Sequence, residues 1–108
     1  MIRTPFAQIR VTTSADSVLI AFSGELDHSL TEEFTPIPAA LKASGLPVRV
    51  DLSEVTFFGA WAVRALLALR AAAPGGVFTV LADSDAVRRT VVASGVTDLV
   101  PLVGSTAL

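Results

Sequence analysis

The chain has 108 residues, of which 52% are hydrophobic and 17% charged, and its formal net charge is −2. This length and composition favour one globular domain over residues 1–108 and exclude a disordered chain. The weak charge, with acids and bases interspersed, gives no electrostatic footprint for nucleic acid or an anionic membrane. No apolar run reaches the roughly 18 to 20 residues of a membrane span, and the N-terminus lacks a signal-peptide core. We therefore expect a cytoplasmic protein with no nucleic-acid partner and no membrane insertion.

Few side chains are available for chemistry. The sequence contains no cysteine and one histidine, His28, so disulfides, thiolate ligands and histidine-based catalysis have little or nothing to use. The Pro74-Gly75-Gly76 turn lacks the lysine and the following helix that a phosphate-binding loop requires. We expect no metal, no cofactor and no enzymatic activity.

The first part of the chain predicts a β-hairpin. Apolar and polar residues alternate over Phe6–Thr13, turn residues follow, and Val18–Phe22 is a second apolar run. Residues 23–28 are expected to form a loop, with Asp27 or Ser29 available to cap the next segment.

Prolines shape the segment that follows. Apolar residues recur at helical spacing over Leu30–Ser44, but Pro36 and Pro38 interrupt them. Because proline disfavours helical geometry in the preceding residue, we expect a short turn at Thr31–Phe34 and a regular helix from about Pro36 or Pro38 to Gly45.

The middle of the chain predicts a strand, a loop and a helix. Val48–Asp51 is predicted to be a buried strand. The loop that follows Asp51 contains a second apolar group, Val55–Phe58, and leads to Gly59. Helical periodicity then runs over residues 60–73. Unpaired backbone N–H groups and the positive end of the helix dipole make such a helix start a candidate functional position.

The last part predicts a further helix between two strands. Val77–Ala82 is strand-like, residues 83–85 cap a short helix that Gly95 ends, and Leu99–Val103 is expected at a sheet edge because Pro101 lacks a ladder donor. A hairpin followed by alternating helices and strands predicts a single α/β domain with a mixed four- to five-stranded sheet and about three to four helices.

At this point the sequence resembles the STAS domains, typified by bacterial anti-sigma factor antagonists. The resemblance covers nearly the whole chain and rests on the order and spacing of four segments together with the hairpin. These are Gly24-Glu25-Leu26-Asp27, Val50–Phe58, Val87-Arg88-Arg89 and Ser94-Gly95.

The phosphorylation motif of that family is altered here. In such antagonists Asp-Ser-Ser-Gly or Asp-Ser-Thr-Gly follows the apolar strand, and its first hydroxyl residue accepts phosphate from the anti-sigma kinase. The four positions here are Gly59, Ala60, Trp61 and Ala62, none of which carries a hydroxyl. The resemblance thus implies a phosphorylation switch whose acceptor is missing, with Ser53 and Thr56 as weak alternatives in the preceding loop.

Trp61 is the strongest candidate for a residue that binds a partner protein. At 100° per residue, Ala62, Val63, Leu66 and Leu69 share the side of the helix expected to face the sheet. Trp61 points nearly opposite, and tryptophan and arginine among small neighbours are typical of an interface. The alternative is that Trp61 covers Phe57 or Phe58 at the edge of the core. The predicted partner-binding residues are Gly59, Ala60, Trp61, Arg64, Ala65 and Ala68.

The other candidates have simpler structural interpretations. Asp51 is expected to bond its own downstream backbone, and Glu25, Asp27 and His28 are expected in a solvated loop without acid–base chemistry. Arg88 and Arg89 are expected on a solvated helix face.

The leading hypothesis is a non-enzymatic interaction module that takes part in regulating transcription by partner switching. Its expected partner is an anti-sigma factor, a switch-type serine kinase or another STAS-domain protein. Two alternatives stay open: a sensory domain in which Trp61 and the loop cover a small molecule, nucleotide or lipid, and a homodimer formed through the Trp61 face.

Overall fold

The chain begins with the predicted hairpin. The structure, a computed structural model, describes residues 7–82, 85–96 and 102–103. Strands β1 (Ala7–Thr13) and β2 (Val18–Leu26) pair antiparallel from Ala7 opposite Gly24 to Thr13 opposite Val18. Ser14 closes the turn between them, because its hydroxyl accepts a hydrogen bond from the backbone N–H of Ser17 at 3.2 Å.

The predicted loop at residues 23–28 is wrong over most of its length, because β2 continues to Leu26. The polar residues Ser23 and Glu25 stay in the strand since they pair with the next strand of the sheet. Asp27 then ends β2 and caps a short 3-10 turn, His28–Leu30, by accepting from the backbone N–H of Ser29 at 2.9 Å.

Two short helices cross back over the sheet. The turn predicted at Thr31–Phe34 is the one-turn helix α1, and α2 spans Ile37–Ser44 with Pro36 at its N-cap. Gly45 ends α2 in the left-handed region at φ 67°, as predicted, a conformation that glycine adopts without steric cost.

The predicted loop after Asp51 is also wrong. Strand β3 runs without interruption over Val48–Phe58, parallel to β2. While β2 advances from Ala21 to Ser23, β3 advances from Asp51 to Glu54, and a second register shift follows. Each shift inserts an extra residue into β3, so the buried positions after Leu52 fall three apart instead of two.

The remaining elements match the predictions closely. They are α3 (Ala60–Ala72), a 3-10 turn at Pro74–Gly76, β4 (Phe78–Leu81), α4 (Asp85–Ala93) and β5 (Leu102–Val103). The predicted caps Asp83 and Ser84, and residues 99–101 of the predicted last strand, lie outside the described residues.

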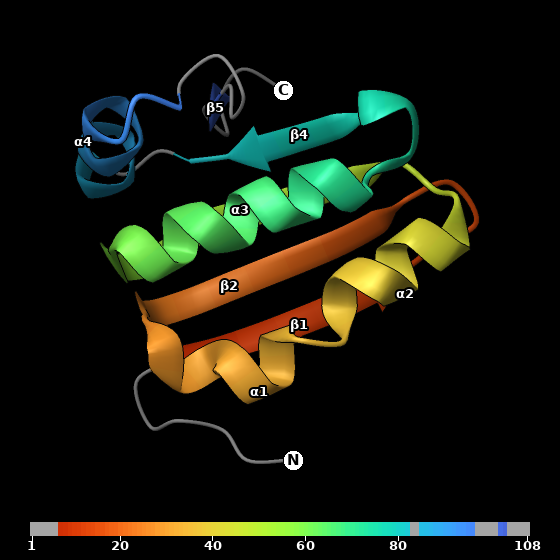
Figure 1. Cartoon of the computed structure of the whole chain (residues 1–108), viewed down its shortest axis with the longest axis horizontal. Coiled ribbons are helices and arrows are strands. Elements are labelled where there is room, and N and C mark those ends of the chain that lie inside the picture. The colour runs from red at the N-terminus through yellow and green to blue at the C-terminus, as the bar shows by residue number, and fades with distance from the viewer. Residues whose placement is uncertain (1–6, 83–84, 97–101, 104–108) are drawn as a thin grey trace.

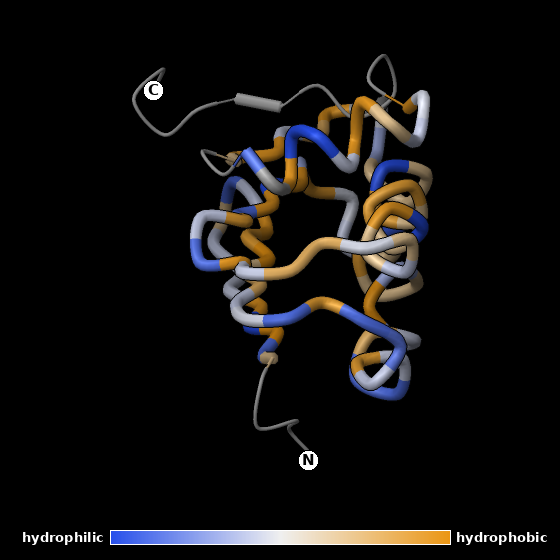
Figure 2. The backbone as a smooth tube through the Cα atoms, turned by 90° about the vertical axis from the view of Figure 1, so that its left-hand side faces the viewer, coloured by the Kyte–Doolittle hydropathy of each residue, from blue (hydrophilic) through white to orange (hydrophobic). Residues whose placement is uncertain are grey.

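The strands lie in chain order, β1-β2-β3-β4-β5, with β2 to β5 parallel to one another. Right-handed crossovers between sequential neighbours place α1, α2 and α3 on the same face of the sheet (Figure 1). Seen from the side, the sheet and these helices form two layers (Figure 2). The core fills the space between the layers, and its fully buried side chains include Ile20, Phe22, Val50, Leu52, Leu66 and Leu69.

Candidate functional site

The start of α3 is a corner without a hydroxyl or charged side chain at residues 59–62. Gly59 is the N-cap in an extended conformation, φ −106° and ψ −164°, and offers no side-chain acceptor to the first turn. Ala60 is exposed, whereas Ala62 is buried against the sheet. Gly59 to Ala62 therefore present a backbone surface with no hydroxyl and no charge.

An exposed aromatic ring covers this helix cap. Phe57 is 53% exposed, although Phe58 beside it is 4% exposed. A Cβ atom at Gly59 would lie 3.1 Å from Cε2 of Phe57, so the phenyl ring lies directly over the glycine. Phe57 is not among the binding residues predicted from the sequence. The available signal was that adjacent strand residues face opposite sides, so only one of the two phenylalanines can enter the core.

Trp61 is half-buried and joins α3 to α1. Its ring meets that of Phe34 edge to face, with centroids 5.5 Å apart and an interplanar angle of 74°. Its indole Nε1 donates to Oγ1 of Thr31 at 3.1 Å, and that hydroxyl donates to the carbonyl of His28 at 2.6 Å. Trp61 also packs against the core cluster that contains Phe58, in agreement with the alternative in which it covers the edge of the core, and its aromatic partner is Phe34.

The faces of α3 follow the predicted periodicity with one exception. Arg64 is exposed and Ala68 half-buried, but Ala65, predicted on the binding face, is only 5% exposed. The reason is that α1 and α2 pack alongside α3, so the helix is covered on its flank as well as by the sheet. The positions predicted to face the sheet are buried: Ala62, Val63, Leu66 and Leu69.

The two alternative hydroxyls lie on β3 and not in a loop. Ser53 and Thr56 are both exposed. The Ser53 hydroxyl donates to Oδ1 of Asp51 at 2.6 Å, and the Ser53 backbone N–H donates to the same oxygen at 2.9 Å. Asp51 thus bonds its own downstream backbone, as predicted.

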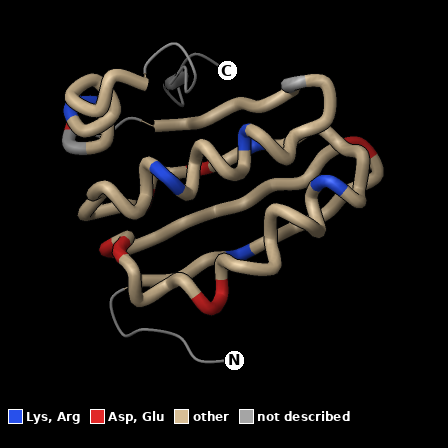
Figure 3. The backbone as a smooth tube through the Cα atoms, viewed as in Figure 1, with Lys and Arg blue, Asp and Glu red and all other residues tan. Residues whose placement is uncertain are grey.

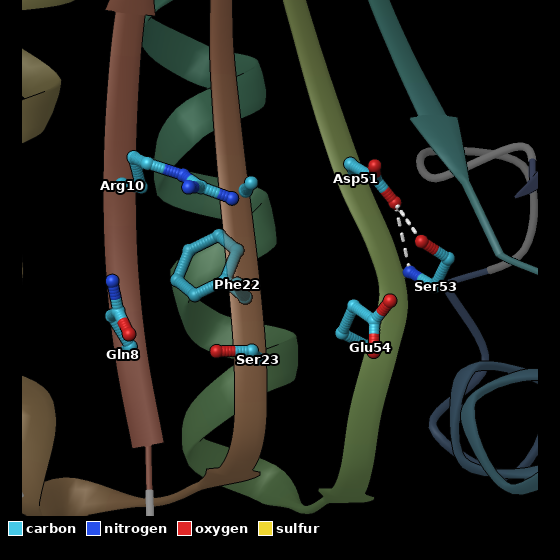
Figure 4. A pocket seen from close by; sticks show the side chains of 8 residues that line it. Gln8, Arg10, Phe22, Ser23, Asp51, Ser53 and Glu54 are labelled. Carbon is cyan, nitrogen blue, oxygen red and sulfur yellow. Dashed lines mark hydrogen bonds between the residues drawn. The ribbon is translucent and has the colours of Figure 1, made fainter.

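Polar side chains line a shallow pocket of about 240 Å³ on the face of the sheet opposite α3. Figure 4 shows Arg10 reaching from β1 across β2, with Asp51 and Ser53 on β3. Ala21 forms a small floor between Arg10 and Asp51, because the three residues occupy one row across the strands. This pocket combines one cation with two acids, Asp51 and Glu54.

The remaining candidate residues are not brought together into a reactive group. Hydrogen bonds from the Ser29 hydroxyl and backbone N–H hold the pKa of Asp27 below its ordinary value. Arg88 and Arg89 are exposed as predicted, and Arg88 Nη2 donates to the carbonyl of Ala82 at 3.1 Å. Glu25 is exposed on β2, and His28 is exposed at the start of the 3-10 turn.

Basic residues are not concentrated on one element in the part of the chain that the structure describes. Lys and Arg positions are scattered over several elements (Figure 3). Among residues 7–82, 85–96 and 102–103, no group of three His, Asp or Glu side chains is placed to hold a metal ion. No described helix is long and apolar enough to cross a membrane.

Comparison with known protein families identifies the type of domain. A family model described as "Mlab, STAS domain" matches residues 9–103. The chain belongs to the STAS domain family. The predicted α/β STAS fold, with its N-terminal hairpin and mixed sheet, is therefore confirmed.

Solved structures of STAS proteins share this fold. An anti-sigma factor antagonist from Mycobacterium paratuberculosis is 25% identical, with a TM-score of 0.78 over 94% of this chain and 89% of that one. The anti-sigma factor antagonist SpoIIAA in its unphosphorylated form is 20% identical, with a TM-score of 0.71 over 92% and 90%. A STAS protein from Planctomyces limnophilus is 21% identical, with a TM-score of 0.65 over 89% and 88%. Among curated protein sequences, no significant match was found.

Proposed function

We propose that this STAS domain is a non-enzymatic interaction module that docks onto an anti-sigma factor or a switch-type serine kinase. The docking surface is the α3 corner, defined as Phe57, Gly59, Ala60, Trp61 and Arg64, with Ala68 at its margin. Ala65 is omitted from this surface because it is buried. The observation that carries the proposal is an exposed aromatic ring and an exposed arginine flanking an uncharged helix start.

The similarity to anti-sigma factor antagonists supports this class of partner. The corner also has the composition of an interface core, since Phe57 and the exposed part of Trp61 are large, rigid and apolar. The STAS family membership favours regulation by binding over catalysis.

We further propose that phosphorylation at the helix start does not regulate this module. Residues 59–62 carry no hydroxyl, so no phosphoester can form there. Ser53 is hydrogen-bonded to Asp51, and a phosphate at this position would lie beside that carboxylate. The protein would then act as a permanently unphosphorylated antagonist or as a paralogue that has changed partner. The change of all four motif positions favours the second.

The test is to titrate the purified protein with candidate anti-sigma kinases, with and without ATP, by calorimetry and intact-mass measurement. Binding by wild type should persist in ATP with no gain of phosphate mass. Arg64→Glu should weaken binding by about tenfold or more, because a charge of the wrong sign enters the interface. Arg70→Glu is the matched control, since Arg70 is also exposed on α3 but lies at its far end.

Two results would contradict the proposal. Equal binding by wild type, Arg64→Glu and Phe57→Ser would remove the α3 corner as the docking surface. Phosphate on Ser53 or Thr56 that abolishes binding would remove the claim that the module is unregulated.

The two alternatives gain less support from the geometry. The cavity beside Trp61 has a volume of about 130 Å³, below the roughly 300 Å³ at which ligand pockets begin. A homodimer would have to use the part of Trp61 that Phe34 leaves free. Unchanged tryptophan fluorescence across a ligand panel, and one monomeric sedimentation coefficient at all concentrations, would exclude these two alternatives respectively.

A further inference from the structure

The outer edge of β1 lies beside an acidic and apolar groove that is separate from the α3 corner. In the described sheet β1 is the terminal strand, paired on one side by β2 and on its other side by no described strand. A groove of about 510 Å³ separates it from the start of the helix layer. An unpaired edge presents alternating N–H and C=O groups that another extended chain can pair with.

The groove has an apolar side. Val11 of β1 is 48% exposed, an unusual exposure for a β-branched residue on the helix-facing side of the strand. Pro36 and Ile37 line the groove opposite Val11. The same three residues line an adjoining cavity of about 200 Å³ that extends along α2 to Ala40. A side chain entering from a neighbouring strand would therefore meet a continuous apolar surface.

The groove also has an unsatisfied acid. Glu32 and Glu33 line it from α1, where the acidic positions lie next to β1 (Figure 3). Oε1 of Glu33 is buried and receives no hydrogen bond from the described residues. A buried carboxylate oxygen is stabilised by a donor, and a cationic side chain is the strongest one.

A second copy of the chain does not suit this edge. Symmetric antiparallel pairing of two β1 strands, each spanning Ala7–Thr13, would place the central residue Arg10 directly opposite its copy. Like charges at opposed positions destabilise a strand pair. Arg10 is exposed on the face of β1 that points away from the helices, and its side chain reaches across β2 toward Asp51. An acid at the paired position of an added strand would lie beside the same guanidinium on its other side.

We propose that the β1 edge binds an extended segment of a partner protein as an additional strand. The segment carries apolar and basic side chains on its groove face, toward Val11, Ile37 and Glu33. It carries an acidic side chain on its other face, next to Arg10. Because strand side chains alternate, the basic and acidic residues occupy adjacent positions in the segment.

The test uses two acetylated heptapeptides of identical composition and the full chain labelled with ¹⁵N. Thr-Val-Glu-Lys-Thr-Val-Thr has the proposed charge order, and Thr-Val-Lys-Glu-Thr-Val-Thr has it reversed. Titration to about 5 mM should shift the amide resonances of β1 with the first peptide, since short peptides with few contacts bind weakly. The reversed peptide should bind roughly fivefold less tightly.

Variants distinguish recognition of the peptide charges from non-specific binding of the peptides. Glu33→Gln should remove most of the difference between the peptides, whereas Glu54→Gln on β3 should leave it unchanged. The double variant Arg10→Glu, Glu33→Lys should invert the preference. Absence of β1 shifts with either peptide, or equal affinities in wild type, would overturn the proposal. The α3 corner contributes no contact to this groove, so neither result depends on the proposed function.

Discussion

The indole Nε1 of Trp61 donates a hydrogen bond to the Thr31 hydroxyl, which lies 30 residues earlier in the chain and 3.1 Å away. This bond and the Phe34 ring contact fasten the one-turn helix α1 to the start of α3. An isolated helix of this length is unstable in water, so its order depends on such tertiary contacts.

Trp61→Ala should therefore lower the free energy of unfolding by roughly 2 to 3 kcal/mol, because an aromatic pair, a hydrogen bond and buried apolar area are lost together. Trp61→Phe keeps a ring and loses the donor, and should cost about 1 kcal/mol. Urea denaturation followed by circular dichroism measures both. A loss below about 0.5 kcal/mol for Trp61→Ala would mean that α1 is held by other contacts.

Leu52 tests the continuity of β3. This side chain is 0% exposed at the first register shift of the strand. Leu52→Ala should destabilise the fold by about 2 to 5 kcal/mol through lost burial and a residual cavity. Thr56→Ala, at an exposed position of the same strand, should stay within about 0.5 kcal/mol of wild type. If Leu52→Ala and Thr56→Ala both change the free energy of unfolding only slightly in chemical denaturation, this part of the chain is a loop and not a continuous strand.

Gly45 and Gly59 should respond differently to alanine. Gly45 has φ +67°, so Gly45→Ala should cost about 1 kcal/mol, although no atom lies within 4 Å of the new Cβ. Gly59 has an ordinary φ of −106°, and its new Cβ would meet only the tip of the flexible Phe57 side chain. Gly59→Ala should cost less than Gly45→Ala in thermal unfolding, and the opposite order would show that the Phe57 ring is fixed.

Asp27 should contribute to the pH dependence of stability. The Ser29 hydroxyl and backbone N–H stabilise its charged form, so its folded-state pKa lies below the ordinary value of 3.8. The unfolded state then binds the proton more readily than the folded state does. The stabilisation of the folded state by ionised Asp27 is therefore complete above pH 3.8 and is lost as the pH falls through the folded-state pKa. Asp27→Asn should remove that dependence. If the free energies of unfolding of wild type and Asp27→Asn change with pH in parallel down to about pH 2, the assignment to Asp27 is wrong.

The order of elements could be predicted from sequence because it depends on local signals. Pro36, Gly45 and the helical spacing of Val63, Leu66 and Leu69 all act within a few residues, and the elements they predict are present. The extent of β3 could not be predicted, since Val55 and Phe58 break the alternation of a strand. That break follows from register shifts against β2, which are properties of two segments far apart in sequence.

The candidate site was predictable to a similar degree. The position of the helix start and the exposure of Arg64 follow from local periodicity. The burial of Ala65 and the pairing of Trp61 with Phe34 depend on how α1 and α2 lie against α3, and no spacing rule encodes that placement.

Sequential strand order with crossovers on one side leaves the two faces of the sheet under different constraints. Residues that point toward the helices, such as Ile20 and Val50, are fixed by packing. Their neighbours Ala21 and Asp51 face the other way, onto the shallow pocket, so a substitution there does not enter the core. Substitutions at the outward-facing strand positions should therefore change the free energy of unfolding little, whereas those at the inward-facing positions should lower it, so the outer surface can vary while the core is retained.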